Sequence, residues 1–277
     1  MRVGIAGVGF MGRTHAAGWR RAGFQVTGLL AESEAEAAGL AAETGARVYR
    51  DLGSLLAEVD VLDVCSPTHL HAGMVIEAAG RGRAVVCEKP LARSLEDGRA
   101  MIQACRKAHV PLLMAHVLRF FPEYEIALSR VAAGELGRLG TLRFERLSYR
   151  PKKPAGNWFL DEDKSGGIIL DLMIHDMDMA RALAGEVRRV YAKRIASLDP
   201  AAPVDYGQAI LTHAGGALSH IAGAWAYPPG HFRTGYEICG QKGILRHDSS
   251  PEAPVNSFLM ARPGEAPDVG LPSSPLA

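Results

Sequence analysis

The sequence carries almost no net charge, and this absence excludes several kinds of partner. Lys plus Arg number 31 and Asp plus Glu number 30, so the 277-residue chain has a formal charge of +1. A protein without an excess of positive charge has no general attraction for nucleic acid or for an anionic membrane surface. We therefore expect a small-molecule ligand as partner, and neither nucleic acid nor a membrane.

Cysteines are few and long apolar runs are missing. The wide spacing of the four cysteines excludes a disulfide framework and disfavours a zinc site. They are Cys65, Cys87, Cys105 and Cys239. No apolar run approaches the length of about 20 residues that crosses a bilayer, and the β-type stretch 2–6 at the start leaves no room for a signal peptide. These observations predict a cytoplasmic protein with reduced cysteines and no metal.

A glycine-rich loop follows the first predicted strand, residues 2–6. It reads Gly7-Val8-Gly9-Phe10-Met11-Gly12 and is followed by a helical stretch. Gly7 permits a tight turn, Gly9 lets a pyrophosphate approach the bare main chain, and Gly12 lets the helix pack on the strand. Because the motif stands between a strand and a helix, it predicts a Rossmann domain whose loop, including Phe10 and Met11, contacts NAD or NADP. The alternative is a plain glycine-rich turn.

Glu32 is the candidate for contact with the cofactor ribose. It follows the predicted strand 24–30, about 20 residues beyond the glycine loop, where dinucleotide-binding domains carry an acid. A carboxylate there accepts hydrogen bonds from a ribose 2′-hydroxyl and repels a 2′-phosphate, which favours NAD. If the strand instead ends at Ala31, Glu32 need not face the ribose, so NADP stays open.

Two later strands also end in polar residues. The strand 59–65 leads into Ser66-Pro67-Thr68-His69-Leu70-His71, and the strand 84–88 ends in Glu88-Lys89-Pro90. Ligands of open α/β sheets bind beyond the carboxyl ends of the strands. We therefore predict further cofactor contacts from Ser66, Pro67, Thr68, His71, Glu88 and Lys89. Capping of the next helix by Ser66 and Thr68 is the alternative, as is a surface position for Lys89; His71 is expected to order its turn and His69 to face solvent.

The second half of the chain has a different pattern. The segment 139–149 alternates apolar and polar residues, with a slip at Arg146-Leu147, and further strands are predicted at 187–197, 206–212, 217–226, 232–239 and 243–247. No helix-length segments separate these later strands, so we expect an open, mostly antiparallel sheet without parallel pairing. The irregular segment 150–165 is predicted to form a loop over the site.

The predicted helix after Gly166-Gly167 carries candidate catalytic residues. Asp171 and His175 are four residues apart, a spacing that places both side chains on one helical face. A histidine can take a proton from a hydroxyl group near neutral pH, and a carboxylate can orient it. The alternatives are a surface ion pair or, with Asp178, a metal cluster.

These motifs together resemble the glucose-fructose oxidoreductase, inositol dehydrogenase and MocA (Gfo/Idh/MocA) family. The resemblance covers roughly residues 1–247 and includes the segments 7–12, 66–71, 87–92, 119–124, 134–137 and 165–176. It implies a Rossmann domain followed by an α/β domain with an open, mostly antiparallel sheet. It also implies that Lys89, Asp171 and His175 line the substrate pocket. The Pro- and Gly-rich stretch after Asp248 departs from the longer final segment of family members.

The resemblance implies an NAD(P)-dependent dehydrogenase acting on a secondary alcohol of a sugar, polyol or inositol. The alternatives are a nucleotide-binding sensor without turnover and an NAD-dependent glycosidase of the same fold. We expect a cofactor domain at 1–117 and a domain for substrate binding and association at 118–277. Arg119, Asn157 and Trp158 are candidate substrate contacts. Apolar residues on both faces of the strand 217–226 predict a homodimer or homotetramer.

Overall fold

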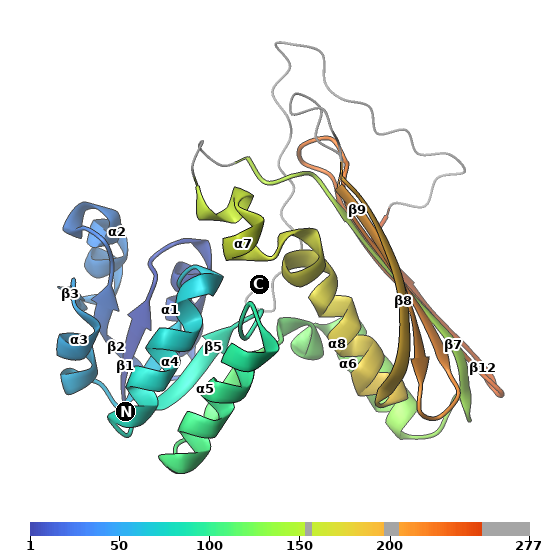
Figure 1. The fold of residues 1–277 in the computed structure, drawn as a ribbon, viewed down its shortest axis with the longest axis horizontal. Coiled ribbons are helices and arrows are strands. Elements are labelled where there is room, and N and C mark those ends of the chain that lie inside the picture. Colours follow the sequence, from blue (N-terminus) through green and yellow to red (C-terminus); the bar gives the residue numbers. More distant parts are fainter. Residues whose placement is uncertain (153–156, 197–204, 251–277) are drawn as a thin grey trace. The chain divides into compact units, whose positions relative to one another are not determined.

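The structure is a computed structural model that describes residues 1–152, 157–196 and 205–250 (Figure 1). The chain divides into two compact units: unit 1 comprises Met1–Ala115 with Gly156–Gly166, and unit 2 comprises His116–Ala155 with Gly167–Ala277. Part of the predicted loop, 153–156, and the final stretch, 251–277, lie outside the described residues. The assignment of cofactor binding to 1–117 and of substrate binding to 118–277 stays a prediction.

Unit 1 contains a six-stranded sheet in the order β3-β2-β1-β4-β5-β6, and all of its strand pairs are parallel. The strands are β1 Arg2–Ala6, β2 Gln25–Leu30, β3 Arg47–Tyr49, β4 Val61–Val64, β5 Ala84–Glu88 and β6 Leu112–Ala115. The strand order reverses direction between β1 and β4. This is the Rossmann topology, and a ligand binds at such a reversal.

Helices flank this sheet (Figure 1). They are α1 Phe10–Arg21, α2 Glu34–Thr44, α3 Leu52–Glu58, α4 His71–Gly80 and α5 Leu95–Lys107, with the short 3-10 helix η1 at Thr68–Leu70. One hydrophobic core includes Ala16 of α1 and Leu40 of α2, and a second includes Leu55 of α3, Val75 of α4 and Met101 of α5. Both faces of the sheet are therefore covered, as its apolar strands require.

Unit 2 contains a six-stranded sheet in the order β12-β11-β7-β10-β9-β8. The strands are β7 Leu139–Ser148, β8 Val187–Ala196, β9 Asp205–His213, β10 Leu218–Trp225, β11 Phe232–Gly240 and β12 Gly243–Asp248. Four of the five pairs are antiparallel, but β7 and β10 are parallel. The expectation of no parallel pairing is therefore wrong. A parallel pair needs a long connection, and the chain from β7 to β10 supplies one through several helical segments and two other strands, β8 and β9.

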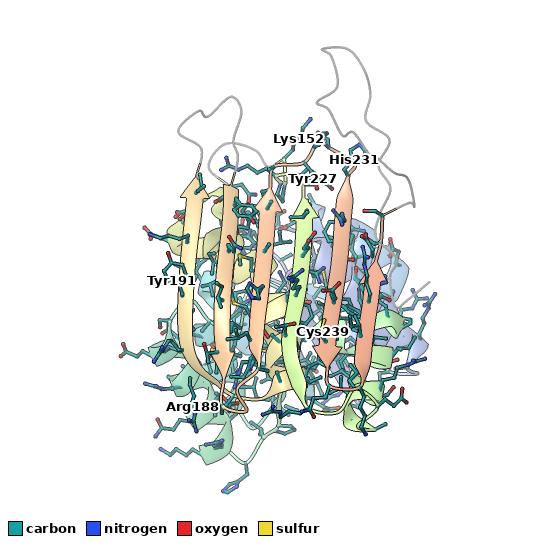
Figure 2. The ribbon with its side chains drawn as sticks, turned by 90° about the vertical axis from the view of Figure 1, so that its right-hand side faces the viewer. Lys152, Arg188, Tyr191, Tyr227, His231 and Cys239 are labelled. Carbon is teal, nitrogen blue, oxygen red and sulfur yellow. The ribbon has the colours of Figure 1, made fainter. Side chains whose placement is uncertain are left out.

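One face of this sheet packs against the helices α6 Pro122–Ala132 and α8 Ile174–Ala184. The core between them includes Tyr124 and Met179 from the helices and Phe144 from β7, all of which are buried. Figure 2 views the opposite face of the sheet, where the labelled Tyr191 and Cys239 point toward the viewer. We call this the open face. Among the described residues, no helix has the length and apolar composition needed to cross a membrane.

The alternation of buried and more exposed side chains along β7 continues to its end. Leu142, Phe144, Arg146 and Ser148 are all buried, so the pattern does not slip at Arg146-Leu147 as the sequence indicated. Arg146 occupies a core position because a buried carboxylate on α8, Asp176, neutralises it. A charged residue at a core position therefore looks like a register slip when its partner is distant in the sequence.

Candidate cofactor and substrate sites

The glycine loop forms a tight turn at the carboxyl end of β1. Gly7 has a φ of +98°, and its main-chain N–H donates to the carbonyl oxygen of Leu30 at 3.0 Å. A Cβ at this position would lie 2.6 Å from the carbonyl oxygen of Cys65, the residue that follows β4. Only glycine therefore fits, and the loop after β1 lies against the loop after β4.

Gly9 and Gly12 differ in what surrounds them. A Cβ on Gly12 would overlap the carbonyl oxygen of Gly7, whereas a Cβ on Gly9 would meet nothing within 4 Å. Gly9 precedes α1, whose N-terminus has no side-chain cap and no acid in its first turn. Phe10 is 73% exposed beside it, and Met11 is half-buried. An open helix N-terminus reached over bare main chain fits the pyrophosphate of a dinucleotide.

Glu32 lies just beyond β2 at the same edge of the sheet. β2 ends at Leu30, and the main-chain N–H of Ala31 still donates to the carbonyl oxygen of Tyr49 at 3.2 Å. The next residue, Glu32, is exposed. Its carboxylate is therefore available to a ribose hydroxyl, and its contact with the cofactor stays a prediction.

His71 connects the loops that follow β4 and β5. The residue is 1% exposed; Nδ1 lies 3.0 Å from the carbonyl oxygen of Pro90 and Nε2 lies 3.0 Å from that of Ser66. Burial outweighs these contacts and lowers the pKa of His71. His71 thus orders its turn, and His69 is exposed, as predicted.

Ser66, Pro67 and Thr68 form the turn between β4 and α4. Ser66 and Thr68 are buried, and Pro67 is half-buried. Neither η1 nor α4 has a side-chain cap, so the alternative in which Ser66 and Thr68 serve as helix caps is wrong. Their contact with a cofactor stays a prediction.

Glu88 and Lys89 follow at the exit of β5. Lys89 is half-buried, and its main-chain N–H donates to Oε2 of the buried Glu88 at 2.8 Å. The peptide bond between Lys89 and Pro90 is cis. Strand β5 therefore presents Lys89 at the edge of the sheet where the glycine loop also lies.

Sequence reasoning missed His15, which lies among acids beneath this edge. His15, Asp63 and Cys65 place potential ligand atoms within 4.8 Å of one another, a group that could hold a metal ion. Each neighbouring carboxylate, however, already accepts a hydrogen bond from an N–H group of His15 or Trp19. One signal in the sequence was available: Asp63 is a fully buried acid within the otherwise apolar strand β4.

In unit 2, Asp171 and His175 lie at the start of the helical segment after Gly167. Asp171 is in a π-helical turn, η4 Ile169–Met173, and His175 is the second residue of α8. Both are half-buried, whereas the neighbouring Met173 and Asp176 are buried. The uniform α-helical spacing used in the sequence analysis is thus wrong for this turn. Such π-turns occur often at functional sites.

The π-turn packs against glycines of the sheet. A Cβ at Gly207 of β9 would lie 2.5 Å from Sδ of Met173, and one at Gly223 of β10 would overlap Cγ of the same side chain. Glycines on two neighbouring strands therefore make room for Met173. This close packing fixes the turn that carries Asp171.

Asp176, next to His175, anchors α8 to the sheet. Its carboxylate accepts hydrogen bonds from Nε and Nη2 of Arg146 at 2.9 and 3.0 Å, and Nη2 also contacts the hydroxyl oxygen of Tyr124 at 3.1 Å. All three side chains are buried. This network holds the beginning of α8 at a defined position on β7.

The three candidate substrate contacts lie in different units. Arg119 of unit 2 forms a bidentate pair with Asp178 at 2.6 and 2.7 Å, so much of its charge is neutralised. Asn157 and Trp158 group with unit 1. There, the ring of Trp158 lies 6.3 Å from that of His69, and Asn157 accepts a hydrogen bond from the Phe159 N–H at 3.0 Å. Their contact with a substrate stays a prediction.

A family model described as "Oxidoreductase family, NAD-binding Rossmann fold" matches residues 1–116, and one described as "GFO/IDH/MocA C-terminal domain" matches residues 124–246. Together they cover most of the chain. The chain belongs to the Gfo/Idh/MocA oxidoreductase family. This Gfo/Idh/MocA protein also has the family's two-domain fold, a parallel-sheet Rossmann domain and a mostly antiparallel sheet domain.

Several relatives of this Gfo/Idh/MocA protein are named dehydrogenases. A D-apiose dehydrogenase from Paraburkholderia graminis is 32% identical over 87% of this chain and 66% of its own length. A myo-inositol 2-dehydrogenase from Thermotoga maritima is 31% identical over 92% of this chain and 77% of its own. The chain thus spans only part of the curated relatives, about half of the length of some.

Solved structures of the family share the fold. The GenD2 protein from gentamicin A biosynthesis, solved with NAD, has a TM-score of 0.82 and 27% identity over 90% of this chain and 72% of its own. The WlbA dehydrogenase from Bordetella pertussis, solved with NADH and UDP-GlcNAcA, has a TM-score of 0.82 and 27% identity over 95% of this chain and 78% of its own.

Proposed function

We propose that this protein is an NAD(P)-dependent oxidoreductase that transfers a hydride between the nicotinamide and a secondary alcohol of a sugar, polyol or inositol. One observation carries the proposal: in a chain of this family, β5 presents Lys89 at the sheet edge where Gly9 leaves an open helix N-terminus. Relatives named for D-apiose and myo-inositol support a polyhydroxylated substrate.

Three residues divide the chemistry on the substrate. His175 takes the proton of the substrate hydroxyl group, because imidazole is the side chain best suited to accept a proton near neutral pH. Asp171, on the preceding turn, orients the imidazole and stabilises its charged form. Lys89 donates hydrogen bonds to the substrate oxygen and stabilises the negative charge that develops there. When bound, the nicotinamide supplies the hydride acceptor.

We favour NAD over NADP as the cofactor. Glu32 is an exposed acid at the end of β2, where a carboxylate accepts hydrogen bonds from a ribose and repels a 2′-phosphate. The solved GenD2 and WlbA structures contain NAD and NADH.

The neutralised pair of Arg119 and Asp178 is consistent with an uncharged substrate.

A panel of sugars, polyols and inositols, followed by cofactor absorbance, tests the activity. On a substrate that is turned over, His175→Ala is expected to lower kcat by about 10²- to 10⁴-fold and to leave cofactor affinity nearly unchanged. The loss shrinks as pH rises and hydroxide replaces the base. His109→Asn is the matched control, since His109 is exposed with a φ of 55°, which asparagine also adopts.

The other two substitutions separate the roles. Lys89→Ala is expected to lower both kcat and cofactor affinity, because the lysine would touch substrate and cofactor together. Asp171→Asn is expected to cost less than His175→Ala if the aspartate only orients the ring. Full activity in all three variants overturns the catalytic assignment, and cofactor binding without any turnover across the panel supports the sensor alternative.

We also propose that the protein associates through the open face of the unit 2 sheet (Figure 2). Tyr191 and Ile195 on β8 are 62% and 65% exposed, and Ile244 on β12 is 66% exposed. Their partners in the strand register place all three on the open face. Apolar side chains left on one side of a sheet are typical of a surface that a second copy covers.

A further inference from the structure

A partly buried histidine in unit 1 lies between two acids from different strands. His15 is on α1; its Nδ1 lies 2.9 Å from Oδ2 of Asp63 on β4, and its Nε2 lies 3.0 Å from Oε1 of Glu88 at the end of β5. The side chains of His15, Asp63 and Glu88 are 13%, 0% and 6% exposed. We call these three residues the acid-histidine cluster.

The two carboxylates of the cluster favour two protons on the ring. A neutral imidazole carries one N–H group, so its other nitrogen would turn a lone pair toward a carboxylate at hydrogen-bond distance. The imidazolium donates to both acids. Burial opposes this charge, but hydrogen bonds to Asp63, Cys65 and Glu88 outweigh burial and raise the pKa of His15. The cluster is thus a positive charge held between two negative charges.

Glu88 links His15 to the main chain of Lys89 by hydrogen bonds. While Oε1 of Glu88 faces His15, its Oε2 accepts the main-chain N–H of Lys89 at 2.8 Å. Both oxygens of the carboxylate are therefore engaged, and its orientation is set. Because α1 begins at Phe10, within the glycine loop, the cluster joins the helix of that loop to the lysine at the exit of β5.

We propose that His15 is a positioning residue that holds Lys89 in register with the glycine loop. The role of Lys89 that it supports rests on the proposed function. His15 does not reach the substrate in this scheme; it acts through the carboxylate of Glu88. Trp19, one turn further along α1, donates a hydrogen bond from Nε1 to Oδ2 of Asp63 at 2.6 Å, whereas the carboxylate of Glu88 is bonded to His15 and to the Lys89 N–H.

The test compares His15→Asn with Trp19→Phe. Asparagine is neutral and too short to bridge both acids, so the link to Glu88 is lost, whereas Trp19→Phe removes one hydrogen bond to Asp63 and keeps that link. Hydrogen exchange of the Lys89 amide, followed by NMR, reports the contact directly and needs no substrate. We expect exchange at least about tenfold faster in His15→Asn, relative to global stability, and unchanged in Trp19→Phe.

Steady-state kinetics provide the second readout. A displacement of Lys89 by about 1 Å is expected to lower kcat about 10²-fold in His15→Asn, and to weaken NAD binding less than Lys89→Ala does. If His15→Asn does not fold, the double variant His15→Asn/Glu88→Gln removes the unpaired charge of Glu88, keeps a side-chain oxygen that can accept from the Lys89 N–H, and carries the same measurements.

Unchanged Lys89 exchange in a folded His15→Asn protein overturns the proposal, as does a kcat equal to that of Trp19→Phe. If no substrate of the panel is turned over, hydrogen exchange of the Lys89 amide alone decides whether His15 positions Lys89. Failure of the positioning role is therefore distinguishable from failure of the proposed activity.

Discussion

The buried pair of Arg146 and Asp176 makes a quantitative prediction about unit 2. Its carboxylate and guanidinium are joined by two hydrogen bonds of 2.9 and 3.0 Å, and the two side chains are 5% and 0% exposed. Asp176→Asn keeps the shape of the side chain but leaves the Arg146 charge buried without an anion. Breaking a buried pair from one side costs about 3–5 kcal/mol, which is a large share of a typical unfolding free energy of about 5–15 kcal/mol.

A control lies on the same strand. Arg143 of β7 pairs with Glu237 across the open face at 3.7 Å, and these side chains are 69% and 34% exposed. Arg143→Ala is expected to lower the unfolding free energy by less than about 1 kcal/mol. The double variant Arg146→Met/Asp176→Leu is expected to recover most of the stability lost in Asp176→Asn, because it leaves no unpaired charge.

Urea unfolding followed by far-ultraviolet circular dichroism measures these differences. Cofactor affinity is measured in parallel, because Asp176→Asn is expected to leave the glycine loop of unit 1 intact. If Asp176→Asn costs no more than Arg143→Ala, the pair does not hold α8 on the sheet, and the reasoning is refuted.

Four further predictions follow from the site and the open face. Gly9→Val should weaken dinucleotide binding and leave the fold intact, because a Cβ at Gly9 meets nothing within 4 Å. Gly12→Ala should lower thermal stability, because a Cβ at Gly12 meets the main chain of Gly7. A dinucleotide affinity of Gly9→Val equal to that of the unmodified protein would contradict the first expectation. In side-by-side titrations NAD should bind more tightly than NADP, and a preference for NADP of tenfold, or about 1.4 kcal/mol, would show that Glu32 does not face the ribose. Light scattering should return a mass at least twice that of one chain, 29.6 kDa. The mass of a single chain at micromolar concentration would exclude association. The pKa of His15 is raised in the folded protein, so its protonated ring contributes its full stabilisation below the unfolded pKa of about 6.5. Above pH 7 the free energy of unfolding should therefore decline by up to about 1.4 kcal/mol per pH unit. The decline should be smaller in His15→Asn.

Local patterns in the sequence determined most of the elements of this protein. The glycine loop, the alternation of strands and helices in residues 1–117 and the strands of the second half are present in the structure. The ends of helix α2 are also set by local residues. The Ser33 side chain accepts a hydrogen bond from the Glu36 N–H at its start, and Gly45 ends the helix with a φ of 71°. These features depend on residues within one or two turns of each other, so the sequence alone contains their cause.

Tertiary structure alone decided which distant residues meet. Arg146 and Asp176 are 30 positions apart, and His15 and Glu88 are 73 apart. An arginine in an alternating strand reads as a slip of register until its buried partner is known, and His15 reads as an ordinary helix residue. The parallel pairing of β7 with β10 and the π-turn at Asp171 also arise from packing between separate elements. Such contacts gain their free energy only when the fold brings them together, and no local period of the sequence records them.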